Sequence, residues 1–293
     1  MAGGVKCKDS APLDVAFVAR IRYWQHGRTR RFENCHSDDD EVNAYTQERL
    51  SKVPAVTLIF WVIKIAATTL GETGGDAVSM SMNLGYLVGT GIFAAIFVVA
   101  VIAQISAKQF HPLLYWATII ATTTVGTTLA DFADRSLGIG YAGGTSLLLI
   151  LVLGSLFVWH RSLGSVSVDT ISSPKAEKFY WVTIMFSQTL GTALGDWTAD
   201  SAGLGYGGSA IVFSSLLAMV AAAWYWTALS RTTLFWAAFI LTRPLGAVVG
   251  DFLDKPVNAG GLALSRYSAS AVLLVFIVAC IFIFPQRAAQ RGH

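Results

Sequence analysis

The chain has 293 residues, of which 54% are hydrophobic and only 13% are charged, whereas a soluble domain carries about 25% charged residues. Beyond Lys52, runs such as 92–103, 146–158 and 268–284 contain no charged residue. This composition excludes an ordinary soluble domain and predicts an all-α integral membrane protein. The net charge of +3 is too small to indicate nucleic-acid binding.

Residues 1–51 form a polar leader, which we expect to be a mobile cytoplasmic extension. The leader lacks the apolar stretch of a cleavable signal peptide, so the first spanning segment is expected to direct membrane insertion. Cys7, Cys35 and Cys280 are widely separated and indicate neither a disulfide framework nor a thiolate metal site.

Eight apolar segments follow the leader, and each is near the ~20 residues that a helix needs to cross a bilayer. We expect these helices at residues 53–76, 87–107, 112–132, 142–160, 178–198, 207–229, 232–252 and 267–285. They pair into four two-helix repeats, and all four run in the same direction because each repeat crosses the membrane twice. The pseudo-symmetry axis is therefore expected along the membrane normal, as in transporters built from parallel repeats.

The first helix of each repeat ends in two small residues four positions apart, followed at once by an aspartate. These aspartates are Asp76, Asp131, Asp196 and Asp251. They are separated by 55, 65 and 55 positions. The ten additional residues lie in 164–175, a serine-rich stretch that contains Pro174 and is typical of a linker.

The linker, residues 162–177, divides the membrane part into halves of two repeats each. We expect the first half at 52–161, the second half at 178–286 and a basic tail at 287–293. Lysine and arginine at the helix ends and in the loops gather mainly on the side of the leader and tail. The positive-inside rule therefore predicts that both termini lie in the cytoplasm and that the four aspartates lie near the outer surface of the membrane.

The small residues before each aspartate lie one helical turn apart, a spacing that lets two helices approach closely in lipid. A helix-packing role is therefore expected for Gly71, Gly75, Gly126, Gly191, Gly195, Gly246 and Gly250. Close packing of four equivalent helices would also bring their aspartates towards one axis.

Acidic residues inside membrane spans usually face a bundle interior or a hydrated cavity. Asp131 precedes Arg135 by four positions and Asp251 precedes Lys255 likewise, which is the spacing of a helical ion pair. Asp76 and Asp196 have no basic residue at that position. The candidate cation-binding or proton-relay residues are Glu72, Asp76, Asp131, Asp196, Asp200 and Asp251.

Two basic residues lie deeper in the apolar segments. Lys64 and Arg243 are expected to set the charge of the site, and they fit equally a buried structural network or an ion-gated path. Hydroxyls just inside the aspartates either bond the helix backbone or line a polar path. These residues are Thr68, Thr69, Thr123, Thr124, Thr127, Thr189 and Thr192.

The sequence contains no Walker, metalloprotease or nucleophile-elbow motif, so no catalytic residue is indicated. Oxygen ligands alone favour a proton or a hard divalent cation such as Mg²⁺, Mn²⁺ or Ca²⁺. No other cofactor is indicated, and the oligomeric state is left open.

The phrases 64–76, 116–134, 180–200 and 235–251 together resemble those of a family of uncharacterised bacterial membrane-anchored proteins with four TTxGxxxGD-like repeats. The resemblance covers roughly residues 53–285 and excludes the leader. It implies a multi-pass architecture in a bacterial inner membrane, and it implies no substrate and no role for any residue.

The leading functional hypothesis is a small transporter or channel for an inorganic cation, with proton coupling as an option. Its expected partners are the lipid bilayer and the transported cation or proton. A second hypothesis is a non-transporting scaffold, sensor or assembly factor whose polar core is structural. A third is an intramembrane enzyme acting on lipid, which requires a lipid-open groove that reaches Asp76 or Asp196.

Overall fold

The computed structural model describes residues 50–290. The expectations for most of the leader and for the last residues of the tail concern positions 1–49 and 291–293, which lie outside the described residues. Eight long helices occur between residues 50 and 290, as predicted. They are α3 (Leu58–Asp76), α4 (Tyr86–Ser106), α5 (Pro112–Asp131), α6 (Tyr141–Leu163), α7 (Pro174–Asp196), α8 (Gly205–Trp226), α9 (Arg231–Asp254) and α10 (Arg266–Ile283).

The first and fifth helices begin at residues that differ from the prediction. Residues before α3 form the strand β1 (Leu50–Pro54), which pairs antiparallel with β2 (Ala288–Gln290), so the expected helical start at residue 53 was wrong. Helix α7 begins at Pro174, four residues earlier than expected. The Ser173 hydroxyl caps this helix by accepting the Ala176 N–H at 3.2 Å, and Pro174 suits the first helical position.

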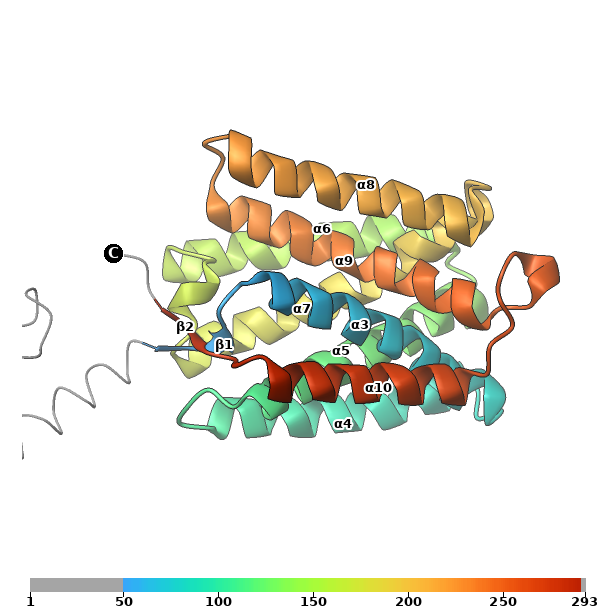
Figure 1. Ribbon diagram of the computed structural model, residues 1–293, viewed down its shortest axis with the longest axis horizontal. Coiled ribbons are helices and arrows are strands. Elements are labelled where there is room, and N and C mark those ends of the chain that lie inside the picture. Colours follow the sequence, from blue (N-terminus) through green and yellow to red (C-terminus); the bar gives the residue numbers. More distant parts are fainter. Residues whose placement is uncertain (1–49, 291–293) are drawn as a thin grey trace, which may run out of the picture. The chain divides into compact units, whose positions relative to one another are not determined.

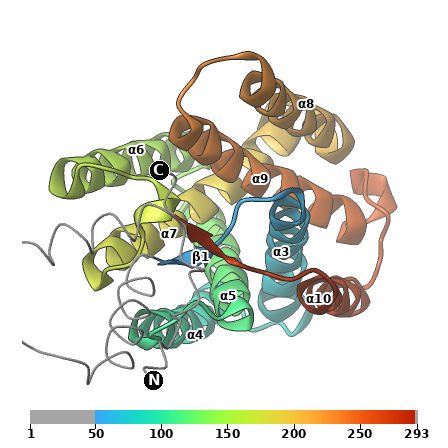
Figure 2. The ribbon, with the colours of Figure 1, turned by 60° about the vertical axis from the view of Figure 1, so that its left-hand side comes forward.

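The first helices of the four repeats form an inner ring, and the second helices surround it. Helix α3 contacts α5 and α9, and α7 closes the ring by contacting the same two helices. Each outer helix packs on the inner helix of the next repeat: α4 on α5, α6 on α7, α8 on α9, and α10 on α3 (Figure 1, Figure 2). No repeat therefore covers its own inner helix, and the fourth repeat is needed to cover the first.

The outer helices have many exposed apolar side chains, whereas most side chains of the inner helices are buried. At least one valine or isoleucine on each outer helix is about two-thirds exposed, for example Val99 (67%), Ile150 (66%), Ile211 (69%) and Val272 (68%). Six of the helices in the described part of the chain are long and apolar enough to cross a membrane: α4, α5 with the turn that follows it, α6, α8, α9 and α10. Helices α3 and α7 are not among these six; α3 contains Lys64 and Glu72, and α7 contains Glu177.

Close packing inside the ring depends on the small residue five positions before each aspartate. A Cβ added to Gly71 would lie 2.5 Å from the Thr123 side chain, and one added to Gly126 would lie 3.0 Å from the backbone of Gln188. Gly191 lies in the same way against the Arg243 side chain, and Gly246 lies against Thr68. Each inner helix thus accommodates a side chain of the next helix around the ring, and the fourth accommodates one from the first.

The small residues next to the aspartates repeat this arrangement one turn further along. Gly75 lies against Thr127, Gly195 against Ala247 and Gly250 against Glu72, with added Cβ atoms 3.1, 3.2 and 2.7 Å from these side chains. The seven glycines for which packing was expected all lie at these contacts between inner helices.

Candidate functional site

Residues at four-position steps before each aspartate form a ridge on every inner helix. We call the sets of equivalent residues the axial layers, and we number each layer by how many sequence positions it precedes the aspartate. Layer 0 is Asp76, Asp131, Asp196 and Asp251; layer 4 is Glu72, Thr127, Thr192 and Ala247; layer 8 is Thr68, Thr123, Gln188 and Arg243; layer 12 is Lys64, Ile119, Ile184 and Phe239; layer 16 is Phe60, Tyr115, Tyr180 and Phe235. All twenty residues are buried, so acidic or basic side chains occur in four consecutive layers of the interior, from layer 0 to layer 12.

Two basic side chains bridge the four aspartates of layer 0. Arg135 contacts Asp131 at 3.0 Å and Asp196 at 3.3 Å. Lys255 contacts Asp251 at 2.9 Å and Asp76 at 2.7 Å. The expected pairs within the second and fourth repeats are therefore present, and the same cations also reach the aspartates of the first and third repeats.

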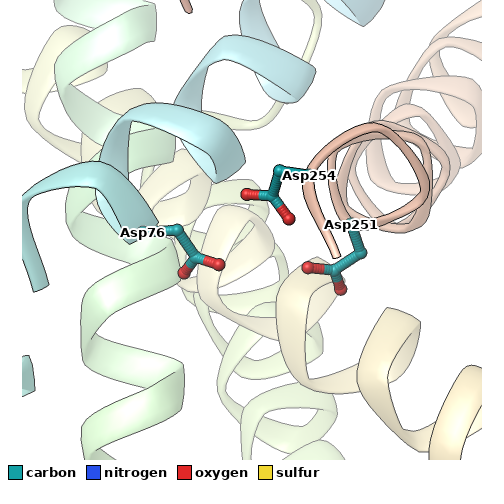
Figure 3. A group of neighbouring side chains, drawn as sticks. All are labelled: Asp76, Asp251 and Asp254. Carbon is teal, nitrogen blue, oxygen red and sulfur yellow. The ribbon is translucent and has the colours of Figure 1, made fainter. Parts of the chain in front are cut away.

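An additional carboxylate, Asp254, lies beside this layer. Figure 3 shows Asp254 of α9 near Asp76 and Asp251, and one oxygen from each of the three carboxylates lies within 4.8 Å of the others. Arg266 of α10 contacts Asp254 at 2.8 Å and Asp76 at 3.7 Å. Three carboxylates and two cations thus form one cluster at this end of the ring.

Sequence reasoning missed Asp254, Arg266 and the equivalent carboxylate Asp134. The predicted aspartates recur in all four repeats, whereas Asp134 and Asp254 occur only in the even-numbered ones. Ser79 and Ala199 occupy the corresponding positions in the other two repeats. A useful signal was available in the phrase aspartate-x-x-aspartate followed by a basic residue, which ends the first helix of both even-numbered repeats.

Asp200, which was expected to join the site beside Asp196, lies at its exposed rim. Its carboxylate accepts a hydrogen bond of 3.4 Å from the Tyr141 hydroxyl. Asp196 itself is buried and contacts Arg135 instead.

Arg243 connects all four inner helices at the centre of the ring. Its Nη2 donates to Glu72 of α3 at 3.0 Å and to Thr127 of α5 at 2.6 Å, and it also bonds the hydroxyl of Thr192 on α7. Thr127 in turn donates to Glu72 at 3.2 Å. Because Arg243 and Glu72 are both buried, each provides the charge partner that the other needs in a low-dielectric interior.

Lys64 lies one layer deeper and has a different environment. It is buried, its Nζ lies 4.2 Å from the ring centroid of Phe239, and among the described residues it has no hydrogen-bond acceptor. The side-chain amide of Gln188 and the hydroxyl of Thr123, both of layer 8, also lack partners. Within the axial layers, most buried side-chain atoms without a hydrogen-bond partner therefore belong to layer 8.

Apart from Thr123, whose hydroxyl has no partner within residues 50–290, the threonines expected to line a polar path divide into two groups. Thr69, Thr124 and Thr189 donate to backbone carbonyls one turn back, at 3.0, 2.8 and 2.9 Å. Thr68 makes similar bonds and also reaches the Thr242 carbonyl of α9 at 3.2 Å. Thr127 and Thr192 bind Arg243, so these two hydroxyls are the ones that join the charged network.

The cluster of Asp76, Asp251 and Asp254 has the ligand chemistry of a hard divalent cation, because carboxylate oxygens suit Mg²⁺, Mn²⁺ and Ca²⁺. Lys255 and Arg266 already form ion pairs with all three of these carboxylates. A metal ion therefore fits here only if at least one of the two basic side chains moves away.

The opposite end of the ring is aromatic. The hydroxyls of Tyr115 and Tyr180 are hydrogen-bonded at 2.7 Å, and Trp116, Trp181 and Trp236 pack around them. The strands β1 and β2 lie at this end, where Lys52 contacts Glu177 of α7 at 2.7 Å. The axial layers thus extend from a charged end to an aromatic end.

A family model described as a repeat of unknown function, DUF347, matches residues 59–110, 114–165, 179–230 and 234–286. These four matches cover most of the chain, which therefore belongs to this family. They confirm the four internal repeats that the spacing of the aspartates predicts. No curated protein and no solved structure matches the chain.

Proposed function

We propose that the chain is an integral membrane protein in which all eight long helices span the bilayer, with the axis of the inner ring along the membrane normal. The exposed apolar faces of α4, α6, α8 and α10 support this placement, because such surfaces are unfavourable in water and suit lipid. Helices α3 and α7 contact lipid less because α10 and α6 cover them. Their polar residues are therefore compatible with a position inside the bundle.

The distribution of basic residues supports a cytoplasmic location for the end that carries β1 and β2. Six basic residues near this end are Lys108, Arg161, Lys175, Lys178, Arg231 and Arg287. The other end carries Arg135, Lys255 and Arg266, and all three are ion-paired with carboxylates. The positive-inside rule then places the aspartate layer at the outer side of a bacterial inner membrane.

We further propose that this protein is a proton-coupled transporter of a small inorganic cation. The observation that carries this proposal is the run of buried ionisable groups along the ring: four aspartates, then Glu72 with Arg243, then Lys64. Ionised groups are costly inside a membrane, and they are typical of ion paths and proton relays. In this scheme the aspartate layer binds the cation, and Glu72 takes up and releases the coupled proton.

A carrier fits this geometry better than an open channel. Arg243 bonds residues of all three other inner helices, and the aromatic layer follows beyond Lys64. A bare metal ion would also be repelled by the guanidinium of Arg243. Cation passage along this axis would therefore require Arg243 to move, whereas a proton could be passed between the side chains.

A comparison of two buried glutamates tests this mechanism. Glu72 pairs with Arg243 at 3.0 Å within the axial layers, whereas Glu177 pairs with Lys52 at 2.7 Å outside them. In proteoliposomes under a pH gradient, an internal pH dye should report proton flux that depends on one divalent cation of a tested series. Glu72→Gln should abolish that flux, and Glu177→Gln should preserve it. Unchanged flux in folded Glu72→Gln protein would refute the proton role.

One specific observation favours the scaffold hypothesis: each aspartate of layer 0 already forms an ion pair with a basic side chain, either Arg135 or Lys255. Under this alternative, the Asp76→Asn and Asp196→Asn double variant loses stability in detergent, and no cation or proton flux is measurable in the wild type. The lipid-enzyme hypothesis gains no support from the groove of about 600 Å³ beside α3, because its lining residues, such as Trp61 and Thr242, include neither Asp76 nor Asp196.

A further inference from the structure

A lateral groove of about 600 Å³ opens between α3, α8 and α9. Its walls are mainly apolar and come from all three helices: Trp61, Ile65, Leu217, Ala221, Leu234 and Ala238. Polar residues lie near one end, where Arg231 of α9 and Asp169 of the linker line the groove. The groove is therefore amphipathic along its length.

The depth of the groove matches one leaflet of a bilayer. Its lining on α9 extends from Arg231 to Thr242, which is about 16 Å at the helical rise of 1.5 Å per residue. The hydrocarbon core of a bilayer is about 30 Å thick. Trp224 and Tyr225 of α8 line the polar end, and these residue types mark the headgroup level of a membrane.

A smaller groove recurs at the equivalent place in the repeat structure. A second groove of about 270 Å³ contains residues of α4 and α7 at the equivalent repeat positions. Trp181 corresponds to Trp61, Met185 to Ile65, Phe97 to Leu217, and Val101 to Ala221. The smaller side chains of Leu217 and Ala221 leave more space in the first groove, which makes it the better site for a long apolar ligand.

The polar end of the larger groove offers one positive and one negative group. The guanidinium of Arg231 lies 4.5 Å from the ring centroid of Trp224 and donates one hydrogen bond to the Trp224 carbonyl, so it keeps further N–H donors. The carboxylate of Asp169 accepts the Ser167 hydroxyl at 3.3 Å. The ion pairs found within residues 50–290 include none between Arg231 and Asp169.

We propose that this groove is a binding site for one phospholipid with a phosphoethanolamine headgroup. Its phosphate contacts Arg231, its ammonium contacts Asp169, and one acyl chain lies between α3, α8 and α9. A choline headgroup cannot donate a hydrogen bond to Asp169, and a glycerol headgroup offers no cation to it. The site rests on the membrane placement proposed above and is independent of transport.

Such a lipid would lie next to the axial layers. The inner end of the groove includes Thr242, whose carbonyl accepts the Thr68 hydroxyl at 3.2 Å. Thr242 also precedes Arg243, the residue that joins the four inner helices. An acyl chain in the groove therefore packs against the contact between α3 and α9 and should stabilise it.

The test uses the full chain, delipidated in detergent, with dioleoyl lipids of ethanolamine, choline or glycerol headgroup added singly. Native mass spectrometry should show ethanolamine lipid bound about tenfold more tightly than the other two, as expected for one additional charge-assisted hydrogen bond. Asp169→Asn should remove that preference. Arg231→Gln should weaken binding of all three lipids, because they share the phosphate.

Two tryptophan substitutions locate the acyl chain. Ala221→Trp fills the groove and should abolish tight lipid binding, whereas Ala95→Trp on the exposed side of α4 should preserve it. Equal affinity for the three headgroups in the wild type would overturn the proposal, as would tight binding by folded Ala221→Trp protein. If the chain instead stays folded and monodisperse without detergent and binds no lipid, the membrane placement itself fails. Because each of these outcomes is a lipid-binding result, none of them depends on whether the protein transports a cation.

Discussion

The two ends of the inner ring are built from the same four repeats but are held together differently. At the aromatic end all four copies carry a tryptophan fifteen positions before the aspartate: Trp61, Trp116, Trp181 and Trp236. At the other end all four copies carry an aspartate, and four adjacent carboxylates repel one another. Arg135 and Lys255, supplied only by the even-numbered repeats, each bridge two of them. Apolar packing thus tolerates four equivalent copies, whereas charge compensation reduces the symmetry to pairs of repeats.

Arg243 lies between the two ends, and its removal should have the largest effect on stability. Arg243→Met leaves Glu72 buried without its cation, which costs about 3–5 kcal/mol in the free energy of unfolding. The measurement is chemical unfolding in detergent. Adding Glu72→Gln to Arg243→Met should recover part of the loss, because the unpaired charge is then removed. If the double variant is as unstable as the sum of the single ones, the two residues do not act as a pair.

Lys255 tests the charged end directly. Lys255→Met leaves Asp76 and Asp251 without their shared cation, and a loss of about 2 kcal/mol is expected for this largely buried group. The loss should appear in the same unfolding assay. Lys178→Met is the control, since none of the ion pairs of the described residues includes Lys178, and it should change stability by less than about 0.5 kcal/mol.

The pKa of Lys255 determines how the stability lost in Lys255→Met should depend on pH. Burial lowers the pKa of Lys255, but the carboxylates of Asp251 and Asp76 raise it more, so that the net shift is upward. A raised lysine pKa contributes stability that is fully present below the unfolded pKa of about 10.4 and is lost only as pH rises through the folded pKa. The difference between wild type and Lys255→Met should therefore stay constant from about pH 7 to about pH 10. A steady decline across that range would mean that Lys255 is not held by the two carboxylates.

The repeat spacing and hydropathy predicted much of this arrangement. The 55-residue period identified four copies, and the runs of apolar residues located eight helices. The order of contacts around the ring was not predictable, because nothing within one repeat specifies that its second helix covers the next repeat's inner helix. The cations of Asp76 and Asp196 were missed for the same reason: Lys255 and Arg135 come from other repeats and lie far away in the sequence.

Two glycines of α3 test whether close contact between inner helices contributes to stability, and the expected effect is smaller than at Lys255. Gly71→Ala places a Cβ 2.5 Å from Thr123 and forces α3 and α5 apart, at an expected cost of about 1–2 kcal/mol. Gly74→Ala in the same helix places its Cβ in open space, with Ser270 Oγ at 4.0 Å. That control should be neutral or up to about 1 kcal/mol stabilising, because alanine favours the helix more than glycine does. Thermal unfolding in detergent distinguishes the two. Equal effects would mean that inner-helix contact does not depend on Gly71.

The smallest effect is expected at the aromatic end, where the Tyr115 and Tyr180 hydroxyls form a neutral hydrogen bond of 2.7 Å. Tyr115→Phe should cost about 1 kcal/mol, because it leaves the buried hydroxyl of Tyr180 without its partner. The double variant, with phenylalanine at both positions, should be close to wild type, because no polar atom is then left unpaired. This outcome would distinguish the aromatic end from the charged end, where removing one bridging cation affects two aspartates at once. A double variant less stable than Tyr115→Phe alone would show that this end also depends on its polar contact, and the contrast between the two ends would fail.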